Sequence, residues 1–319
     1  MNAVLKPSAT EKYALCAHIS RREAWDIEAD VIRSRRFDAD EKYLPDALCL
    51  SAAFTTLSER ERRFVSRIQG RTYANVFGLV ERFITAKLLE IGGDHSLGDQ
   101  NALEALVRFS EEELKHQALF RRIDGLMAEA MPEGYRFDVD SDQVARVVLA
   151  HSTWAVLVLT LHIELFVHQH YRQSIAPDSG LSSLFKDVFF FHWRDECQHV
   201  VLDELELARH DATLTAAERE GGVDDFIALV GAVDGILRAQ AKSDAGYFVR
   251  HCGRPVGEQE AAGIASQFLR AYRWQYILSG AAHPRFQAIL GSLITKAQAG
   301  RIGAAVDALK SDDERSHAP

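Results

Sequence analysis

Two Glu-x-x-His pairs are the residues in this sequence whose types and spacing most clearly suggest chemistry. They are Glu113 with His116, and Glu196 with His199. On a helix, a spacing of three residues places both side chains on one face, so that both can bind the same metal ion. The pairs alone carry little weight, because 13 histidines and 46 acidic residues produce about two such matches by chance.

Two further glutamates give the pairs their specificity. Glu81 precedes Glu113 by 32 residues, and Glu164 precedes Glu196 by the same number. The two midpoints fall in GGDHSLGD (92–99) and APDSG (176–180), which their glycines, aspartates and proline mark as turns. Two antiparallel helices joined near a midpoint hold equidistant residues at the same height. The repeated spacing therefore predicts two helical hairpins whose four glutamates converge.

The sequence around these glutamates is apolar. Glu81 sits among Phe77, Ile84 and Leu88 at helical spacing, and Glu164 lies within a long apolar stretch. A buried carboxylate is costly unless it is paired or bound to a metal ion. Buried ion pairs in an ordinary helical protein are the alternative, but they leave the repeated spacing unexplained. We therefore interpret the four glutamates and the two histidines as ligands of two metal ions.

A third histidine shares a face with the second pair. His192, Glu196 and His199 form H-x-x-x-E-x-x-H, and at about 100° per residue all three point the same way. His192 is either a seventh ligand or a core histidine in the aromatic run VFFFHW. His168 lies four residues after Glu164 and is expected to support the site or the core rather than bind metal. Carboxylates with a few imidazoles and no thiolate favour iron, or manganese, over a structural zinc site.

Two more acids are candidates for orienting the histidines. Asp195 and Glu112 each come directly before a ligand glutamate. A histidine that binds a metal ion usually donates its second N–H to a carboxylate. We therefore expect Asp195 to hold His116 and Glu112 to hold His199, across the bundle. The alternative is that both are solvated acids at a helix edge.

Long helices must position all these residues. Seven prolines and 20 glycines are few for 319 residues, which favours helices over many short strands. The pattern predicts one or two helices before residue 57 and a crossover at 133–142. The main helices are expected at about 58–91 (capped by Thr56 or Ser58), 101–130, 142–173, 181–209, 223–250, 257–279 and 284–309. We expect a single helical domain of residues 1–319, with a bundle core at about 58–210 and C-terminal helices at about 223–310 packed on it.

Composition excludes several classes of partner. The net charge is −9, and no basic cluster follows a helix face, so nucleic acid is not expected. The N-terminal residues lack the apolar run of a signal peptide. The longest uninterrupted apolar stretch, Thr153 to Leu161, is too short to span a bilayer. The four cysteines show no CxxC pairing, as expected for reduced thiols in the cytoplasm.

The complete motif resembles that of the ferritin-like di-iron carboxylate proteins, E…ExxH…E…ExxH. Glu81, Glu113 with His116, Glu164, and Glu196 with His199 match it residue by residue. Within that superfamily, the HxxxExxH of the last helix resembles the p-aminobenzoate N-oxygenase group, in which an additional histidine binds iron. Here that histidine is His192.

The resemblance implies an all-α, ferritin-like four-helix bundle with additional N- and C-terminal helices and two iron ions. It implies a di-iron oxygenase that uses O2 to oxidise a small organic substrate, with an arylamine as the target in the N-oxygenase group, and no catalytic residue beyond the metal ligands. The sequence has no GxGxxG after a strand, so electrons are expected from an external donor or reductase. A homodimer is common in this group. The alternatives are another di-metal oxidase or hydroxylase on the same scaffold, and a metal-binding bundle without enzymatic activity.

Overall fold

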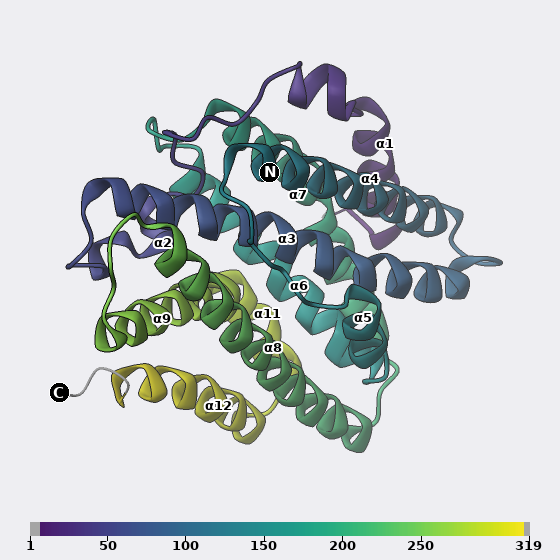
Figure 1. The fold of residues 1–319 in the computed structure, drawn as a ribbon. Coiled ribbons are helices and arrows are strands. Elements are labelled where there is room, and N and C mark those ends of the chain that lie inside the picture. The colour runs from purple at the N-terminus through teal and green to yellow at the C-terminus, as the bar shows by residue number, and fades with distance from the viewer. Residues whose placement is uncertain (1–6, 316–319) are drawn as a thin grey trace, which may run out of the picture.

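The computed structural model describes residues 7–315, with side chains described to residue 310, and its regular structure is helical (Figure 1). Within residues 7–315 there is no strand, only an isolated bridge between Lys42 and Leu181. The predicted all-α class is therefore confirmed. In the same residues, no helix combines the length and the apolar composition needed to cross a membrane.

Four long helices form the central bundle as two antiparallel hairpins. The first hairpin pairs α3 (Glu59–Gly92) with α4 (Gln100–Ala130), and the second pairs α6 (Thr153–His170) with α7 (Ser183–Asp211). The 3-10 helix η3 (Gly93–His95) connects the first pair, and in the second the π-helix η4 (Tyr171–Ile175) continues α6 to a turn at 176–180. Both connections include the segments that the sequence predicts as turns, 92–99 and 176–180.

Local capping fixes where the first hairpin begins. Ser58, rather than Thr56, caps α3, because its side chain accepts the backbone N–H of Glu61 while the Glu61 carboxylate accepts the backbone N–H of Ser58. Asp99 caps α4 by accepting the backbone N–H groups of Asn101 and Ala102. Both caps satisfy amides that have no partner within the helix.

The single helix predicted at 142–173 is wrong, because the chain breaks there. The structure has α5 (Ser141–Leu149) and then α6, separated at residues 150–152. The backbone N–H of Ser152 donates to a carboxylate oxygen of Asp225 at 2.8 Å, so a distant helix stabilises the break. The break falls at Ala150, His151 and Ser152, where polar residues interrupt the apolar stretch, and the contact of Ser152 with Asp225 stabilises it.

The C-terminal helices also differ from the prediction in their bounds. Helix α8 (Ala216–His251) starts earlier than expected and runs through Gly221 and Gly222. A Cβ atom at Gly222 would lie only 2.9 Å from the Trp154 side chain, so this glycine allows close packing and does not end a helix. The predicted helix at 257–279 appears as α9 (Glu258–Arg273), η5 (Trp274–Leu278) and α10 (Ser279–Ala281). The one at 284–309 is divided into α11 (Pro284–Leu293) and α12 (Lys296–Arg315).

The remaining elements cover the bundle. The N-terminal part contains α1 (Ala9–Arg22), η1 (Ile27–Ile32), α2 (Asp46–Cys49) and η2 (Ser51–Ala53). Helix α1 packs on α4 and α7, whereas α8 packs on α3 and α6. Figure 1 shows α1 on one side of the bundle and α8, α9 and α12 on the other. Helix α6 is therefore enclosed, which explains why its sequence is apolar nearly all round.

Candidate metal centre

All seven predicted ligand residues lie together inside the bundle, and each is at most 2% exposed. They come from all four helices, in the order Glu81 (α3), Glu113 and His116 (α4), Glu164 (α6), and His192, Glu196 and His199 (α7). Burying this many ionisable side chains at one place is costly unless they bind each other or a cation.

These residues form two groups. The nitrogen-rich group consists of Glu81, His116, His192 and Glu196, and the oxygen-rich group consists of Glu113, Glu164, Glu196 and His199. In each group, one nitrogen or oxygen atom from every residue lies within 4.8 Å of the others. Glu196 belongs to both groups, so the two sets of donor atoms share one carboxylate.

His192 faces the carboxylates of the nitrogen-rich group. Its Nε2 is 2.7 Å from Oε1 of Glu196 and 3.1 Å from Oε1 of Glu81. The ring is also packed among aromatics, with the centroid of Phe77 at 5.3 Å and that of Phe120 at 5.1 Å. The side chain is therefore buried in the core and aimed at the site, and its role as a ligand stays a prediction.

The two acids that precede the ligand glutamates hold the other two histidines, as the sequence predicts. His116 donates its Nε2–H to Asp195 at 3.0 Å, and His199 donates its Nε2–H to Glu112 at 2.9 Å. This fixes the tautomer in which Nδ1 of each ring faces the glutamates. Nδ1 of His116 is 3.4 Å from Glu196. The expectation that these acids reach across the bundle is confirmed.

The N-terminal segment supports these acids, which the sequence did not reveal. The Trp25 indole N–H donates to Asp195 at 2.9 Å. From α4, the Lys115 ammonium lies 3.0 Å from the same carboxylate. The Ser20 hydroxyl donates to Glu112 at 2.7 Å. These contacts join residues far apart in the chain, and no motif or spacing marks them.

His168 lies outside both groups. Its ring packs beside Trp193 at 5.9 Å, and its Nε2 is buried without a hydrogen-bond partner. Burial lowers the pKa of His168, so the ring stays neutral. This agrees with the expectation that His168 supports the core or the site rather than binding a metal ion.

The electrostatics show that the cluster holds excess negative charge. Burial, together with Glu113 and Glu196, raises the pKa of Glu81 well above its usual value, and burial with Glu196 does the same to Glu164. Burial alone would lower the pKa of His116, but the hydrogen bond to Asp195 and the nearby carboxylates of Glu113 and Glu196 raise it to about 9. Without added cations, the carboxylates must share the available protons.

Several donor atoms of the cluster have no hydrogen-bond partner among the described residues. Both carboxylate oxygens of Glu113, one oxygen each of Glu81 and Glu164, and Nδ1 of His116 are buried without a hydrogen bond. A buried polar atom without a partner is destabilising. Four ionised glutamates carry four negative charges, which two divalent cations balance. The donor set and its charge therefore fit a pair of metal ions such as iron or manganese.

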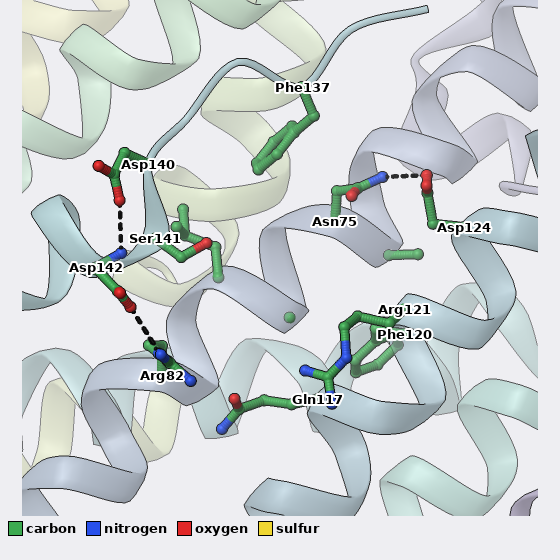
Figure 2. Close-up of a pocket in the computed structure, with 13 residues that line it drawn as sticks. Asn75, Arg82, Gln117, Phe120, Arg121, Asp124, Phe137, Asp140, Ser141 and Asp142 are labelled. Atoms are coloured by element: carbon green, nitrogen blue, oxygen red, sulfur yellow. Dashed lines mark hydrogen bonds and ion pairs between the residues drawn. The ribbon is translucent and has the colours of Figure 1, made fainter.

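A polar cavity of about 450 Å³ lies between α3, α4 and the segment that leads into α5. Figure 2 shows Gln117, Phe120 and Arg121 of α4 facing Ser141 and its neighbours at the start of α5. Phe120 lines this cavity, and its ring centroid is 5.1 Å from that of His192. Gln117 donates to the backbone carbonyl of Glu81 at 3.2 Å. A molecule in this cavity would lie one side chain away from the cluster.

An apolar cavity of about 620 Å³ lies on another side of α3, between α3, α5, α6 and α8. Its wall is mostly aliphatic, and it shares only Leu79 and Asp140 with the polar cavity. Phe166 belongs to this wall and lies 6.3 Å, between ring centroids, from Phe77. Along this line of ring contacts, Phe166 and Phe77 lie between the apolar cavity and His192.

The chain matches no protein-family model and no curated protein. It is similar to the solved structure of an R2-like ligand-binding oxidase mutant with an aerobically reconstituted Fe/Fe cofactor. The identity is 14% and the TM-score 0.42, over 82% of this chain and 92% of the other. Another mutant of an R2-like ligand-binding oxidase, with an aerobically reconstituted Mn/Fe cofactor, is 13% identical. Its TM-score is 0.36, over 96% of this chain and 94% of the other. Likenesses this distant assign neither a family nor a metal to this chain.

Proposed function

We propose that this chain is a di-metal oxidase that binds two iron ions, or manganese in place of iron, and oxidises a small organic substrate with O2. One observation carries the proposal: seven buried side chains from four helices form two groups of donor atoms that share Glu196. A purely structural core gains nothing from four carboxylates at its centre, because their burial costs more than apolar packing would.

The chain's own residues would hold the metal pair and keep water away. The four glutamates, Nδ1 of His116 and His199, and Nε2 of His192 are the donor atoms, with Glu196 shared between the ions. When bound, the metal pair supplies the redox chemistry that reduces O2 and oxidises the substrate. Phe109 stacks on His199 at 3.7 Å, and this close contact helps exclude water from that side of the site.

We further propose that the substrate binds in the polar cavity and that N-oxygenation of an arylamine is the first candidate reaction. The resemblance to the N-oxygenases rests on His192, and Phe120 of the cavity wall lies beside His192. Phe120 offers an aromatic face to a ring, and the volume suits a small ligand. Electrons would come from a separate donor.

A second candidate reaction is hydroxylation of an apolar molecule in the apolar cavity. The observation that favours it is the larger volume and the aliphatic lining of this cavity. An apolar ligand would be stabilised there by the surface it buries. The two candidates place the substrate on different sides of Leu79, so they can be separated by substitutions.

The metal proposal is tested by elemental analysis of protein expressed in iron-replete medium. We expect two metal ions per chain, and fewer in Glu113→Ala. The control is Glu111→Ala, which removes an exposed carboxylate from the same helix and should change nothing. One zinc ion per chain that neither substitution affects would contradict the proposal.

The substrate proposal is tested with two substitutions on α5, which borders both cavities. Ser141→Trp would fill the polar cavity, and Val147→Trp would fill the apolar one. Iron-loaded protein is supplied with a chemical reductant, O2 and either aniline or ethylbenzene, and products that contain one added oxygen atom are measured by mass spectrometry. We expect Ser141→Trp to suppress oxidation of aniline and to leave ethylbenzene unaffected. The opposite pattern would favour hydroxylation.

A further inference from the structure

A buried tyrosine–histidine pair lies beyond the metal centre on the same helix as Glu81. Tyr73 is 1% exposed and His170 is 2% exposed. The Tyr73 hydroxyl is 2.8 Å from Nδ1 of His170. The structure describes all eight tyrosines of the chain, and Tyr73 is the one whose hydroxyl hydrogen-bonds to a histidine ring. Neither residue belongs to the two groups of donor atoms.

The hydrogen bonds around His170 fix the direction in which a proton can move. Ser279 donates its single hydroxyl proton to the backbone carbonyl of Gln275 at 3.2 Å. Ser279 must therefore accept the Nε2–H of His170, at 2.9 Å. Nδ1 of His170 then carries a lone pair and accepts the Tyr73 hydroxyl proton. Burial lowers the pKa of His170 to about 3, so the ring is a neutral acceptor.

An aromatic path connects this pair to the metal centre. The ring centroid of Tyr73 is 4.8 Å from that of Phe77, which is 5.3 Å from the ring of His192. A second path runs through Phe189, 5.1 Å from Tyr73 and 6.1 Å from His192. Electron transfer over such short steps through packed rings does not require the side chains to move.

We propose that Tyr73 is an oxidisable tyrosine that serves the metal centre when no substrate is bound, an inference that rests on the proposed function. Tyr73 gives one electron, through Phe77 or Phe189, to the metal pair after its reaction with O2. Its O–H bond breaks, and the proton forms an N–H bond at Nδ1 of His170. The products are a neutral tyrosyl radical, an imidazolium and a metal pair reduced by one electron.

The geometry gives each residue of the pair a separate part in this step. An oxidised phenol is a far stronger acid than neutral tyrosine, so even a weakly basic imidazole accepts its proton. Both side chains are almost fully buried, which slows the loss of a radical to solvent. When no substrate is bound, Tyr73 therefore supplies the electron, so that the ligand side chains around the metal pair are not oxidised instead.

The test is electron paramagnetic resonance of reduced, iron-loaded protein that is mixed with O2 without substrate and frozen rapidly. We expect a tyrosyl signal that narrows when ring-deuterated tyrosine is incorporated. Tyr73→Phe should abolish the signal while the bound iron and the consumption of O2 persist. The matched control is Tyr247→Phe, because Tyr247 is equally buried and donates to the carbonyl of Pro132 instead of a histidine.

His170→Asn separates proton acceptance from packing. The asparagine oxygen can accept the Tyr73 hydrogen bond but cannot take its proton, so radical formation should slow by about a hundredfold. Tyr272→Phe tests a competing buried phenol whose hydroxyl has an acceptor that can take a proton, because Tyr272 donates to Asp244 at 2.5 Å. A signal that survives Tyr73→Phe and disappears in Tyr272→Phe would overturn the assignment.

Measurements of iron content and O2 uptake on the same samples separate this inference from the proposed function. Protein that binds iron and consumes O2 but forms no tyrosyl radical overturns the role of Tyr73 alone, and leaves it a structural residue. Protein that binds no iron overturns both. Suppression of the radical by a bound substrate supports the inference, because the substrate then supplies the electrons instead.

Discussion

The two halves of the candidate metal centre are built from the same helical pattern but carry different donors. Each hairpin supplies one glutamate and one Glu-x-x-His pair, which by themselves give two equal halves. The position four residues before the ligand glutamate breaks this symmetry: it is His192 on α7, whereas on α4 it is Phe109. Phe109 stacks on His199, while His192 faces Glu81 and Glu196. One residue therefore makes one group richer in nitrogen.

The acids that hold the histidines of the two halves also differ, in burial and in the number of groups that bind them. Asp195, which holds His116, is 1% exposed and is also bound by Trp25 and Lys115. Glu112, which holds His199, is 6% exposed and is also bound by Ser20. His116, in the nitrogen-rich group, is thus held by a more strongly supported acid than His199 is. The comparison teaches that a symmetric backbone repeat can present two chemically different metal sites.

The largest expected effect is on the carboxylate that both groups share. Glu196→Ala should reduce bound iron from two ions per chain to almost none, because both groups lose a donor. Glu164→Ala should leave about one ion, since Glu164 belongs to the oxygen-rich group alone. Elemental analysis of both variants measures the difference. Equal losses from both substitutions would show that the two groups do not bind separate ions.

The next effect in size concerns the two supporting acids. Asp195→Asn and Glu112→Gln should each weaken metal affinity by about 10- to 100-fold, because the histidine loses the partner that orients its ring. The loss should be larger for Asp195→Asn, since that acid holds more donors. Competition with a chelator measures the affinity. Asp187→Asn is the control, because this partly buried acid of α7 pairs with Arg33 and Arg35 and not with a histidine of the cluster. An equal loss there would remove the distinction.

A smaller effect on metal content is expected from His192→Ala, with a clear effect on chemistry. The other six ligands remain, so iron content should stay near two ions per chain, whereas the rate or spectrum of the reaction with O2 should change. Stopped-flow absorption measures this, beside a thermal melt. His168→Ala is the control, because that histidine lies outside both groups. If only the melting temperature falls, by the equivalent of about 1–3 kcal/mol, His192 is a packing residue and the N-oxygenase resemblance is lost.

The smallest effect is expected where the N-terminal segment contacts the acids. Ser20→Ala and Trp25→Phe each remove one hydrogen bond to a buried carboxylate and should lower the free energy of unfolding by about 1–3 kcal/mol. Trp25→Phe should cost more, because its acid is the more buried of the two. Urea unfolding of the metal-free protein gives both values. A larger loss of unfolding free energy in Ser20→Ala would contradict this, and would mean that the oxygen-rich half depends more on its contact with the N-terminal segment.

The sequence alone was enough to predict the bundle and the residues that converge in it. Helical geometry is local: about 100° and 1.5 Å per residue fix which side chains share a face and how far each lies from a turn. The equal spacing of Glu81 from Glu113 and of Glu164 from Glu196 therefore carried three-dimensional information. So did the pairing of Asp195 with His116, because the acid's place beside Glu196 followed from the same geometry.

Only the tertiary structure decided the features that depend on how the helices pack. The break before α6 follows from a contact with Asp225, and the unbroken start of α8 follows from the fit of Gly222 against Trp154. The hydrogen bond from Trp25 to Asp195 and the two cavities join segments that no periodicity relates. The energy of such contacts depends on the distance between side chains from different helices, and the order of residues along one helix does not contain that distance.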